Sequence, residues 1–203
     1  MRFVYVHGFA SSPMSRKAQG FREALAQRGI ELEIPAMDDG DFEHLTITGQ
    51  LRVLEREIRS EPVCLVASSM GGLVGSLYAA AQPEVSRLVL LAPAFGFAQR
   101  WHRKLGPLNM PDFEVFHHGE GRMRRVNYGL IEDGLQYPGQ PDFVQPALIF
   151  HGIHDETVPI EYSRQFVATH ANARLVELES DHELLNVLDL VVDEAMPFLM
   201  ESR

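Results

Sequence analysis

The sequence predicts an α/β fold built on a doubly wound, mostly parallel sheet of about six strands, with helices on both faces and a short cap insertion. Short apolar runs alternate with longer amphipathic segments along the 203 residues, an order typical of parallel strands joined by helices. The length suits one domain that buries roughly 70% of the surface exposed by its unfolded chain. We therefore expect a single domain over residues 1–203, in which 95–145 forms a cap-like insertion.

Six apolar runs are candidates for the strands of this sheet. They are Phe3–His7, Glu31–Ile34, Val63–Ser68, Arg87–Leu91, Ala147–Phe150 and Arg174–Leu178. Right-handed crossovers between parallel strands would carry the connecting helices over both faces of the sheet.

The segments between these runs have the spacing of helices. They are Ser15–Arg28, Thr46–Ser60, Gly71–Ala81, Glu161–Thr169 and a last helix that starts at Glu183 and whose regular end is limited by Pro197. In the second segment, Leu51, Leu54 and Ile58 form one apolar stripe, and Pro62 follows its end, as expected of an amphipathic helix. The third is small and apolar almost all round, so we expect a buried central helix.

Residues 95–145 break the alternation of strands and helices. Seven glycines and several prolines interrupt this segment, and its apolar residues show no clear period. It is also rich in aromatic residues, which favour a packed cap over a disordered loop: Phe95, Phe97, Trp101, Phe113, Phe116, Tyr128 and Tyr137. We expect a cap of short helices and loops over the sheet.

The composition argues against several classes of protein. The formal net charge is −10, whereas binding to nucleic acid or to an anionic membrane needs a basic face. No stretch approaches the roughly 20 apolar residues of a membrane-spanning helix, and the N-terminal apolar run is too short for a secretory signal. The single cysteine, Cys64, excludes an internal disulfide framework. We expect a cytoplasmic protein with a small-molecule partner and neither a nucleic-acid nor a membrane partner.

The strongest functional signal is the segment Val63–Gly72, in which an apolar strand runs through small residues into a helix. It resembles the nucleophile elbow of the α/β-hydrolases, where a serine occupies a strained turn and the residues two before and two after it are very small. Ala67 and Gly71 flank Ser69 in this register, whereas the corresponding neighbours of Ser68 are bulky. The resemblance implies Ser69 as the nucleophile, with alanine in place of the family's usual first glycine.

Three further motifs extend the resemblance over nearly the whole chain, each at the end of a predicted strand. Asp155 follows the penultimate strand and His182 the last one, which gives the chain order Ser, Asp, His of the family. The resemblance implies His182 as general base and Asp155 as the acid that orients it. The His-Gly-Phe motif after the first strand resembles the oxyanion loop, and it implies that the backbone N–H groups of Phe9 and Met70 stabilise the oxyanion.

Neighbouring residues offer alternatives for these roles. Glu156 is adjacent to the implied acid but would point elsewhere, and Asp181 cannot easily reach the ring of the histidine that follows it. His7 is better suited to supporting its loop by hydrogen bonding than to catalysis. A zinc or manganese site is a further alternative, with these ligand candidates: His117, His118, His151, His154 and Asp155. The chain lacks a His-x-x-x-His pair and a Gly-x-Gly-x-x-Gly turn, so we expect neither a metal nor a cofactor.

The resemblance implies a serine hydrolase that cleaves carboxylic esters or thioesters through an acyl-enzyme intermediate. Among α/β-hydrolases, the chain is most similar to small esterases and thioesterases with a reduced cap and to the related acyl-protein thioesterase and acyl-glucuronide esterase branch. The aromatic residues of the cap are candidates for an acyl pocket, and Arg100, Trp101 and Arg103 are candidates for binding the substrate, with an anionic leaving group as the ligand; the alternative is a solvated basic loop. The alternatives are a peptidase or amidase on the same triad, and a non-catalytic binding protein with the same fold.

Overall fold

The computed structural model describes residues 1–59, 61–106 and 112–201, so Ser60 of the second predicted helix and 107–111 of the predicted cap lie outside the described residues. Its main sheet has five strands in the order β1-β2-β3-β6-β7, and all four pairings are parallel. The strands are β1 (Arg2–Val6), β2 (Val63–Ser68), β3 (Val85–Leu91), β6 (Ala147–Gly152) and β7 (Ala173–Leu178). The predicted mostly parallel α/β architecture is therefore confirmed.

The sixth predicted strand, Glu31–Ile34, is not a strand. Only one bridge forms here, between Val4 and Glu33, with a hydrogen bond from the Tyr5 N–H to the Glu33 carbonyl oxygen of 2.8 Å. Pro35 follows at once and, having no N–H, cannot extend the ladder. The bridge lies on the side of β1 away from β2. After β1 the chain therefore runs outward to 31–34 and then returns across β1 to form β2, so the strand order reverses between β1 and β2. Open α/β sheets bind ligands at such a switch point.

The helices follow the prediction except at the C-terminal end of the chain. They are α1 (Arg16–Ala26), α2 (Ile47–Ile58), α3 (Met70–Ala81), α6 (Glu161–Thr169) and α7 (Leu188–Met200). The last helix was expected to start at Glu183, but Leu184 has a left-handed φ of 55° and a short 3₁₀ turn, Leu185–Val187, comes first. Nor does Pro197 end α7, because a proline in the last turn removes only one hydrogen bond near the helix terminus.

Two apolar clusters fill the space between the sheet and its helices. The side chains of β1 alternate, so that Val4 and Val6 belong to one cluster while Phe3 and Tyr5 belong to the other. Residues of α2, α3 and α6 pack in the first cluster, and residues of α1 and α7 in the second. This division confirms the predicted helices on both faces of the sheet.

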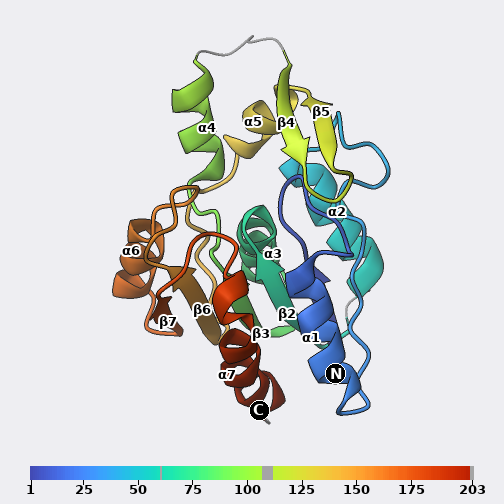
Figure 1. Ribbon diagram of the computed structural model, residues 1–203, viewed down its shortest axis with the longest axis vertical. Helices are drawn as coiled ribbons and strands as arrows, with labels where there is room; N and C mark the ends of the chain where they lie inside the picture. The colour runs from blue at the N-terminus through green and yellow to red at the C-terminus, as the bar shows by residue number, and fades with distance from the viewer. Residues whose placement is uncertain (60, 107–111, 202–203) are drawn as a thin grey trace.

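The cap elements lie together at one end of the molecule, opposite the two chain termini (Figure 1). They are α4 (Phe97–Leu105), β4 (Phe113–His117), β5 (Arg122–Val126) and α5 (Gly129–Gly134). The antiparallel hairpin of β4 and β5 corrects the expectation that this region holds only short helices and loops. No helix among the described residues is long and apolar enough to cross a membrane.

Candidate active site

Ser69 occupies a strained turn between β2 and α3. Its φ of 54° and ψ of −121° are unusual for a residue with a side chain. A Cβ added to Gly71 would lie 2.3 Å from the Val6 carbonyl oxygen, and one added to Gly8 would lie 3.1 Å from the Ser69 Cβ. The first strand therefore passes so close to the turn that Gly71 cannot carry a side chain without a shift of the backbone, and Gly8 has little room for one, which explains the small-residue pattern around Ser69.

The three residues implied as a triad meet at the carboxyl ends of three strands. The His182 Nε2 lies 2.9 Å from the Ser69 Oγ, and the His182 Nδ1 lies 2.6 Å from the Asp155 Oδ2. With Asp155 ionised, the Nδ1–H donates to its carboxylate, which leaves Nε2 free to accept the Ser69 proton. These hydrogen bonds form a continuous line from the serine hydroxyl to the buried carboxylate.

Asp155 is held as a carboxylate by several donors. Its Oδ1 accepts hydrogen bonds from the backbone N–H groups of Thr157 and Val158, at 2.9 and 2.7 Å. Burial favours the neutral form, but the hydrogen bonds from His151, His182 and the Val158 N–H outweigh it and lower the pKa of Asp155. The carboxylate is therefore ionised at neutral pH and can stabilise a protonated His182.

His151, considered from the sequence only as a metal ligand, instead contacts the acid of the triad. Its ring is fully buried, with Nε2 at 2.8 Å from the Val158 carbonyl oxygen and 3.1 Å from the Asp155 Oδ2. Its Nδ1 lies 2.8 Å from the Ser163 Oγ. His151 thus braces the acid loop, a role that depends on a loop closing back on its own strand and has no signature in the sequence.

The alternative residues lie in other positions. Glu156 and Asp181 are exposed, and the Asp181 Oδ1 accepts a hydrogen bond from the Glu183 N–H. Of the side chains considered as metal ligands, His151 and Asp155 are in contact, but within 1–59, 61–106 and 112–201 no three His, Cys, Asp or Glu side chains are arranged to hold a metal.

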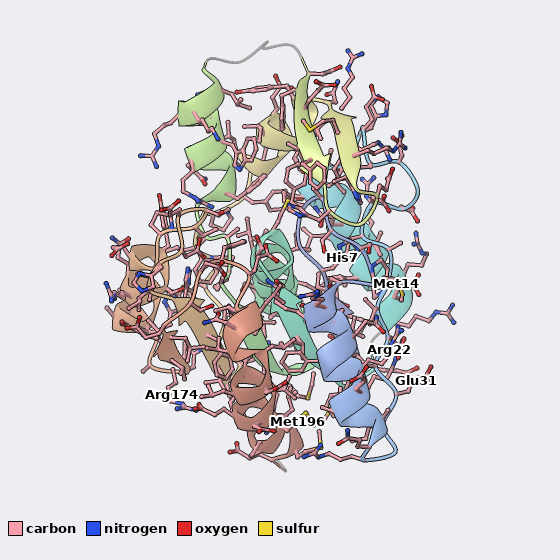
Figure 2. All side chains as sticks on the ribbon, in the orientation of Figure 1. His7, Met14, Arg22, Glu31, Arg174 and Met196 are labelled. Atoms are coloured by element: carbon pink, nitrogen blue, oxygen red, sulfur yellow. The ribbon has the colours of Figure 1, made fainter. Side chains whose placement is uncertain are left out.

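The loop after β1 presents the backbone groups implied as an oxyanion hole. Neither the Phe9 N–H nor the Met70 N–H donates a hydrogen bond to another residue in the described part of the chain, so both are free to meet a ligand. His7, labelled in Figure 2, holds this loop. Its Nδ1 lies 3.0 Å from the Gly8 carbonyl oxygen, and its Nε2 accepts from the Met37 N–H at 3.2 Å. Burial lowers the pKa of His7, in keeping with this neutral tautomer.

A cavity of about 720 Å³ opens beside Ser69 and His182. Trp101 lines it from the cap, where its ring packs on Phe9 and Phe113 with centroid distances of 6.0 and 5.2 Å. Aromatic side chains give this wall of the cavity an apolar character.

The two arginines considered as substrate ligands differ in position. Arg100 lines the cavity, although its Nη1 already donates to the Thr157 carbonyl oxygen at 2.7 Å. Its buried Nε has no hydrogen-bond partner among the described residues, and burial lowers the pKa of Arg100. Arg103 does not line the cavity; one turn farther along α4, its Nη2 lies 3.3 Å from the Tyr162 hydroxyl in an exposed position.

Comparison with known protein sequences gives one family and one curated relative. The model of the Uncharacterised protein family (UPF0227) matches residues 2–198. The human protein ABHD12B is 30% identical over 119 residues, which are 55% of this chain but only 31% of that protein. The matched region thus spans less than a third of the relative's length.

Solved structures resemble the whole chain. Est1E from Butyrivibrio proteoclasticus has a TM-score of 0.80 at 23% identity, over 98% of this chain and 86% of its own. Alpha/beta hydrolase domain-containing protein 10 from mouse has a TM-score of 0.80 at 19% identity, over 97% and 88%. A monoacylglycerol lipase from Paleococcus ferrophilus has a TM-score of 0.73 at 16% identity, over 94% and 93%. These likenesses confirm the predicted α/β-hydrolase fold.

Proposed function

The chain belongs to the uncharacterised protein family UPF0227, and we propose that it is a serine hydrolase that cleaves carboxylic esters or thioesters through an acyl-enzyme intermediate. The observation that carries the proposal is the unbroken hydrogen-bonded line Ser69–His182–Asp155 beside a cavity of about 720 Å³. A buried carboxylate, a histidine and a strained serine in this geometry form an activated nucleophile.

The first half of the reaction forms the acyl-enzyme. The Ser69 Oγ attacks the carbonyl carbon of the substrate while the His182 Nε2 takes the hydroxyl proton. The negative charge that develops on the carbonyl oxygen is stabilised by the N–H groups of Phe9 and Met70. Asp155 stabilises the imidazolium, and it can do so because its own hydrogen bonds keep it ionised.

The second half releases both products. The His182 imidazolium gives its proton to the oxygen or sulfur atom of the leaving group as the bond to the carbonyl carbon breaks. A water molecule then attacks the acyl group, His182 takes a proton from that water, and the same proton returns to the Ser69 Oγ as the free acid leaves. No atom is gained or lost by the protein over the cycle.

The walls of the cavity favour an apolar acyl group. Phe97, Trp101, Val115 and Phe116 line it from the cap side, and contact with such side chains stabilises apolar groups removed from water. Est1E has been solved with ferulic acid bound, and another structural neighbour is named a monoacylglycerol lipase. These names support ester over amide substrates for this chain.

Activity-based labelling tests the proposal. We expect a fluorophosphonate probe to modify Ser69 covalently, and Ser69→Ala to abolish both labelling and hydrolysis of p-nitrophenyl butyrate while its urea unfolding midpoint stays close to that of the parent. Ser76→Ala is the matched control, because this buried serine lies on α3, is not part of the cavity lining and donates to the Gly72 carbonyl oxygen. An adduct mapped to Ser68, or full activity in Ser69→Ala, would contradict the assignment.

A further inference from the structure

Lys17 is a buried cation in the candidate active site that the reaction above does not use. It is 7% exposed and lines the cavity. Its Nζ donates a long hydrogen bond of 3.4 Å to the His182 carbonyl oxygen and lies 3.9 Å from the Glu183 Oε2. An ammonium has three donors, and a buried charge is costly unless it is well paired. Lys17 therefore has donor capacity to offer a ligand in the cavity.

Tyr5 supplies a second polar group on the same side of the cavity. Its side chain is fully buried and its hydroxyl makes no well-formed hydrogen bond among the described residues, although the hydroxyls of Ser15 and Ser68 are its polar neighbours. Tyr5 also lines the cavity. Burial raises the pKa of this hydroxyl, so it stays protonated and can donate to an acceptor on a ligand.

The first turn of α1 adds backbone donors at the same place. This 11-residue helix starts beside Lys17, and the Ser15 Oγ accepts a hydrogen bond from the Ala18 N–H at 3.4 Å. In the described part of the chain, the N–H groups of Arg16 and Lys17 have no acceptor, and both residues line the cavity. A helix N-terminus carries a partial positive charge that favours an anion.

Together these groups point to a ligand. We propose that Lys17, the Tyr5 hydroxyl and the first turn of α1 form a subsite for a carboxylate of the substrate, so that the preferred substrates are esters or thioesters whose leaving group is anionic. The proposal rests on the hydrolase function proposed above. It moves the recognition of an anionic leaving group, which the sequence placed at Arg100 and Arg103, to the start of α1.

The surroundings of Lys17 favour a ligand with a single negative charge. Glu183, Asp155 and Asp181 all act on its ammonium electrostatically, even though burial outweighs them and lowers the pKa of Lys17. A phosphate dianion would meet stronger repulsion from the same acids than a carboxylate, whose single charge matches that of the Lys17 ammonium.

The position of Lys17 indicates which part of the substrate carries the charge. His182 must protonate the leaving atom, so the leaving group lies on the His182 side of Ser69. The Lys17 Nζ contacts the backbone of His182 itself, whereas the apolar wall comes from the cap. The acyl group thus faces Trp101 and the leaving group faces α1.

A binding experiment tests the subsite without catalysis. We expect Ser69→Ala to bind 4-hydroxybenzoate, the product of an anionic leaving group, at least about tenfold more tightly than its neutral methyl ester, as measured by isothermal titration calorimetry. Lys17→Met or Tyr5→Phe in the same background should remove most of this difference. Arg22→Met is the matched control, because it removes one charge from α1 outside the cavity (Figure 2).

Kinetics on a matched ester pair test the consequence for substrate choice. The pair is 4-acetoxybenzoate and its methyl ester, which share the acetyl group and the position of the scissile bond. We expect Lys17→Met and Tyr5→Phe to raise the KM for the anionic ester by about tenfold or more, with little change in kcat or in either constant for the neutral ester. Lys17→Arg should restore most of the preference.

The outcomes separate this proposal from the hydrolase function. Loss of kcat for both esters in Lys17→Met would show that Lys17 only positions the His182 loop, and the subsite would be wrong. Equal binding of acid and methyl ester by Ser69→Ala would also overturn it, as would stronger competition by inorganic phosphate than by 4-hydroxybenzoate. Failure of the parent protein to hydrolyse either ester, with binding of the acid intact, would overturn the hydrolase function instead.

Discussion

The nucleophile turn in 63–72 and the cap hairpin in 113–126 differ in what fixes their conformation. Around Ser69 two backbone segments touch, and a Cβ on Gly71 would lie 2.3 Å from a carbonyl oxygen of β1. At the tip of the hairpin, Gly121 has a φ of 67°, and among the described residues no atom beyond its chain neighbours lies within 4 Å of an added Cβ. The turn around Ser69 is thus fixed by a close backbone approach, whereas the hairpin leaves Gly121 open although its Gly119 lies against Ser12. The proposed nucleophile lies in the first region, whereas the second contributes part of the cavity wall through Val115 and Phe116.

Replacing a carboxylate by an amide at the partner of His182 and at the base of the cap hairpin gives the largest expected contrast. Asp155→Asn places an amide where His182 needs an acceptor that orients its ring, so we expect kcat to fall on the order of 10³–10⁴-fold. Asp112→Asn is the matched change in the cap, where the carboxylate accepts from the Asn127 amide, and should leave kcat close to the parent value. Steady-state assays with p-nitrophenyl butyrate compare the two. Similar kcat values for both variants would contradict the role of Asp155.

The stability of the parent relative to Asp155→Asn should depend on pH. Because the pKa of Asp155 is lowered in the folded protein, its ionised form stabilises the fold above the unfolded value of about 4. This contribution is lost as the pH falls below that value toward the folded pKa. We expect the free energy of unfolding to differ between parent and Asp155→Asn at pH 6 and to converge below about pH 4. A constant difference would show that Asp155 is not ionised in the fold.

Gly71→Ala should have the next largest effect, on stability. The new methyl group would lie 2.3 and 2.6 Å from the carbonyl oxygens of Val6 and His7, so β1 or the turn must move. We expect a loss of more than about 3 kcal/mol in the free energy of unfolding, measured by urea denaturation. The shift would also displace Ser69 and lower activity. A stable and fully active variant would show that the close approach is not required.

The sequence predicted the positions of those candidate site residues that the strand ends determine. The flanks of Ser69 follow from sterics, and the places of Asp155 and His182 follow from the rule that the carboxyl ends of parallel strands share one edge of a sheet. Ser15 was placed at the start of a predicted helix by its position before an amphipathic run, and it caps α1. Each of these features depends on neighbours close in sequence or on a general property of the fold.

Features that depend on distant or exposed contacts were not predictable. Strand β5 contains three arginines in five residues, so its sequence does not show the apolar alternation typical of a strand. Arg122 and Arg124 form ion pairs with Glu120. Lys17 reaches the backbone of His182 across 165 positions of the chain. His151 has a polar environment only because the acid loop folds back over it. No local pattern records such contacts.

Trp101→Ala should weaken substrate binding more than catalysis. The indole packs between Phe9 and Phe113 on the cavity wall, away from the hydrogen bonds that activate Ser69. We expect the KM for p-nitrophenyl octanoate to rise by about tenfold, the effect of roughly 1.4 kcal/mol of lost apolar contact, with a small change in kcat. Hydrolysis of p-nitrophenyl acetate is the internal control, since a two-carbon acyl group has little apolar surface to place on this wall. An equal rise in KM for both esters would show that Trp101 does not contact the acyl group.

Gly121→Ala in the cap should have the smallest effect. In the part of the chain that the structure describes, no atom beyond the chain neighbours lies within 4 Å of the new methyl group. The expected cost is that of a left-handed φ of 67° for a residue with a Cβ, about 1 kcal/mol. Asn tolerates this conformation better, so Gly121→Asn should cost less, while the kcat for p-nitrophenyl butyrate should match the parent in both variants. Urea denaturation measures the free energy of unfolding of both variants. A loss for Gly121→Ala as large as that for Gly71→Ala would mean that the hairpin is as tightly constrained as the nucleophile turn, and the contrast between the two regions would fail.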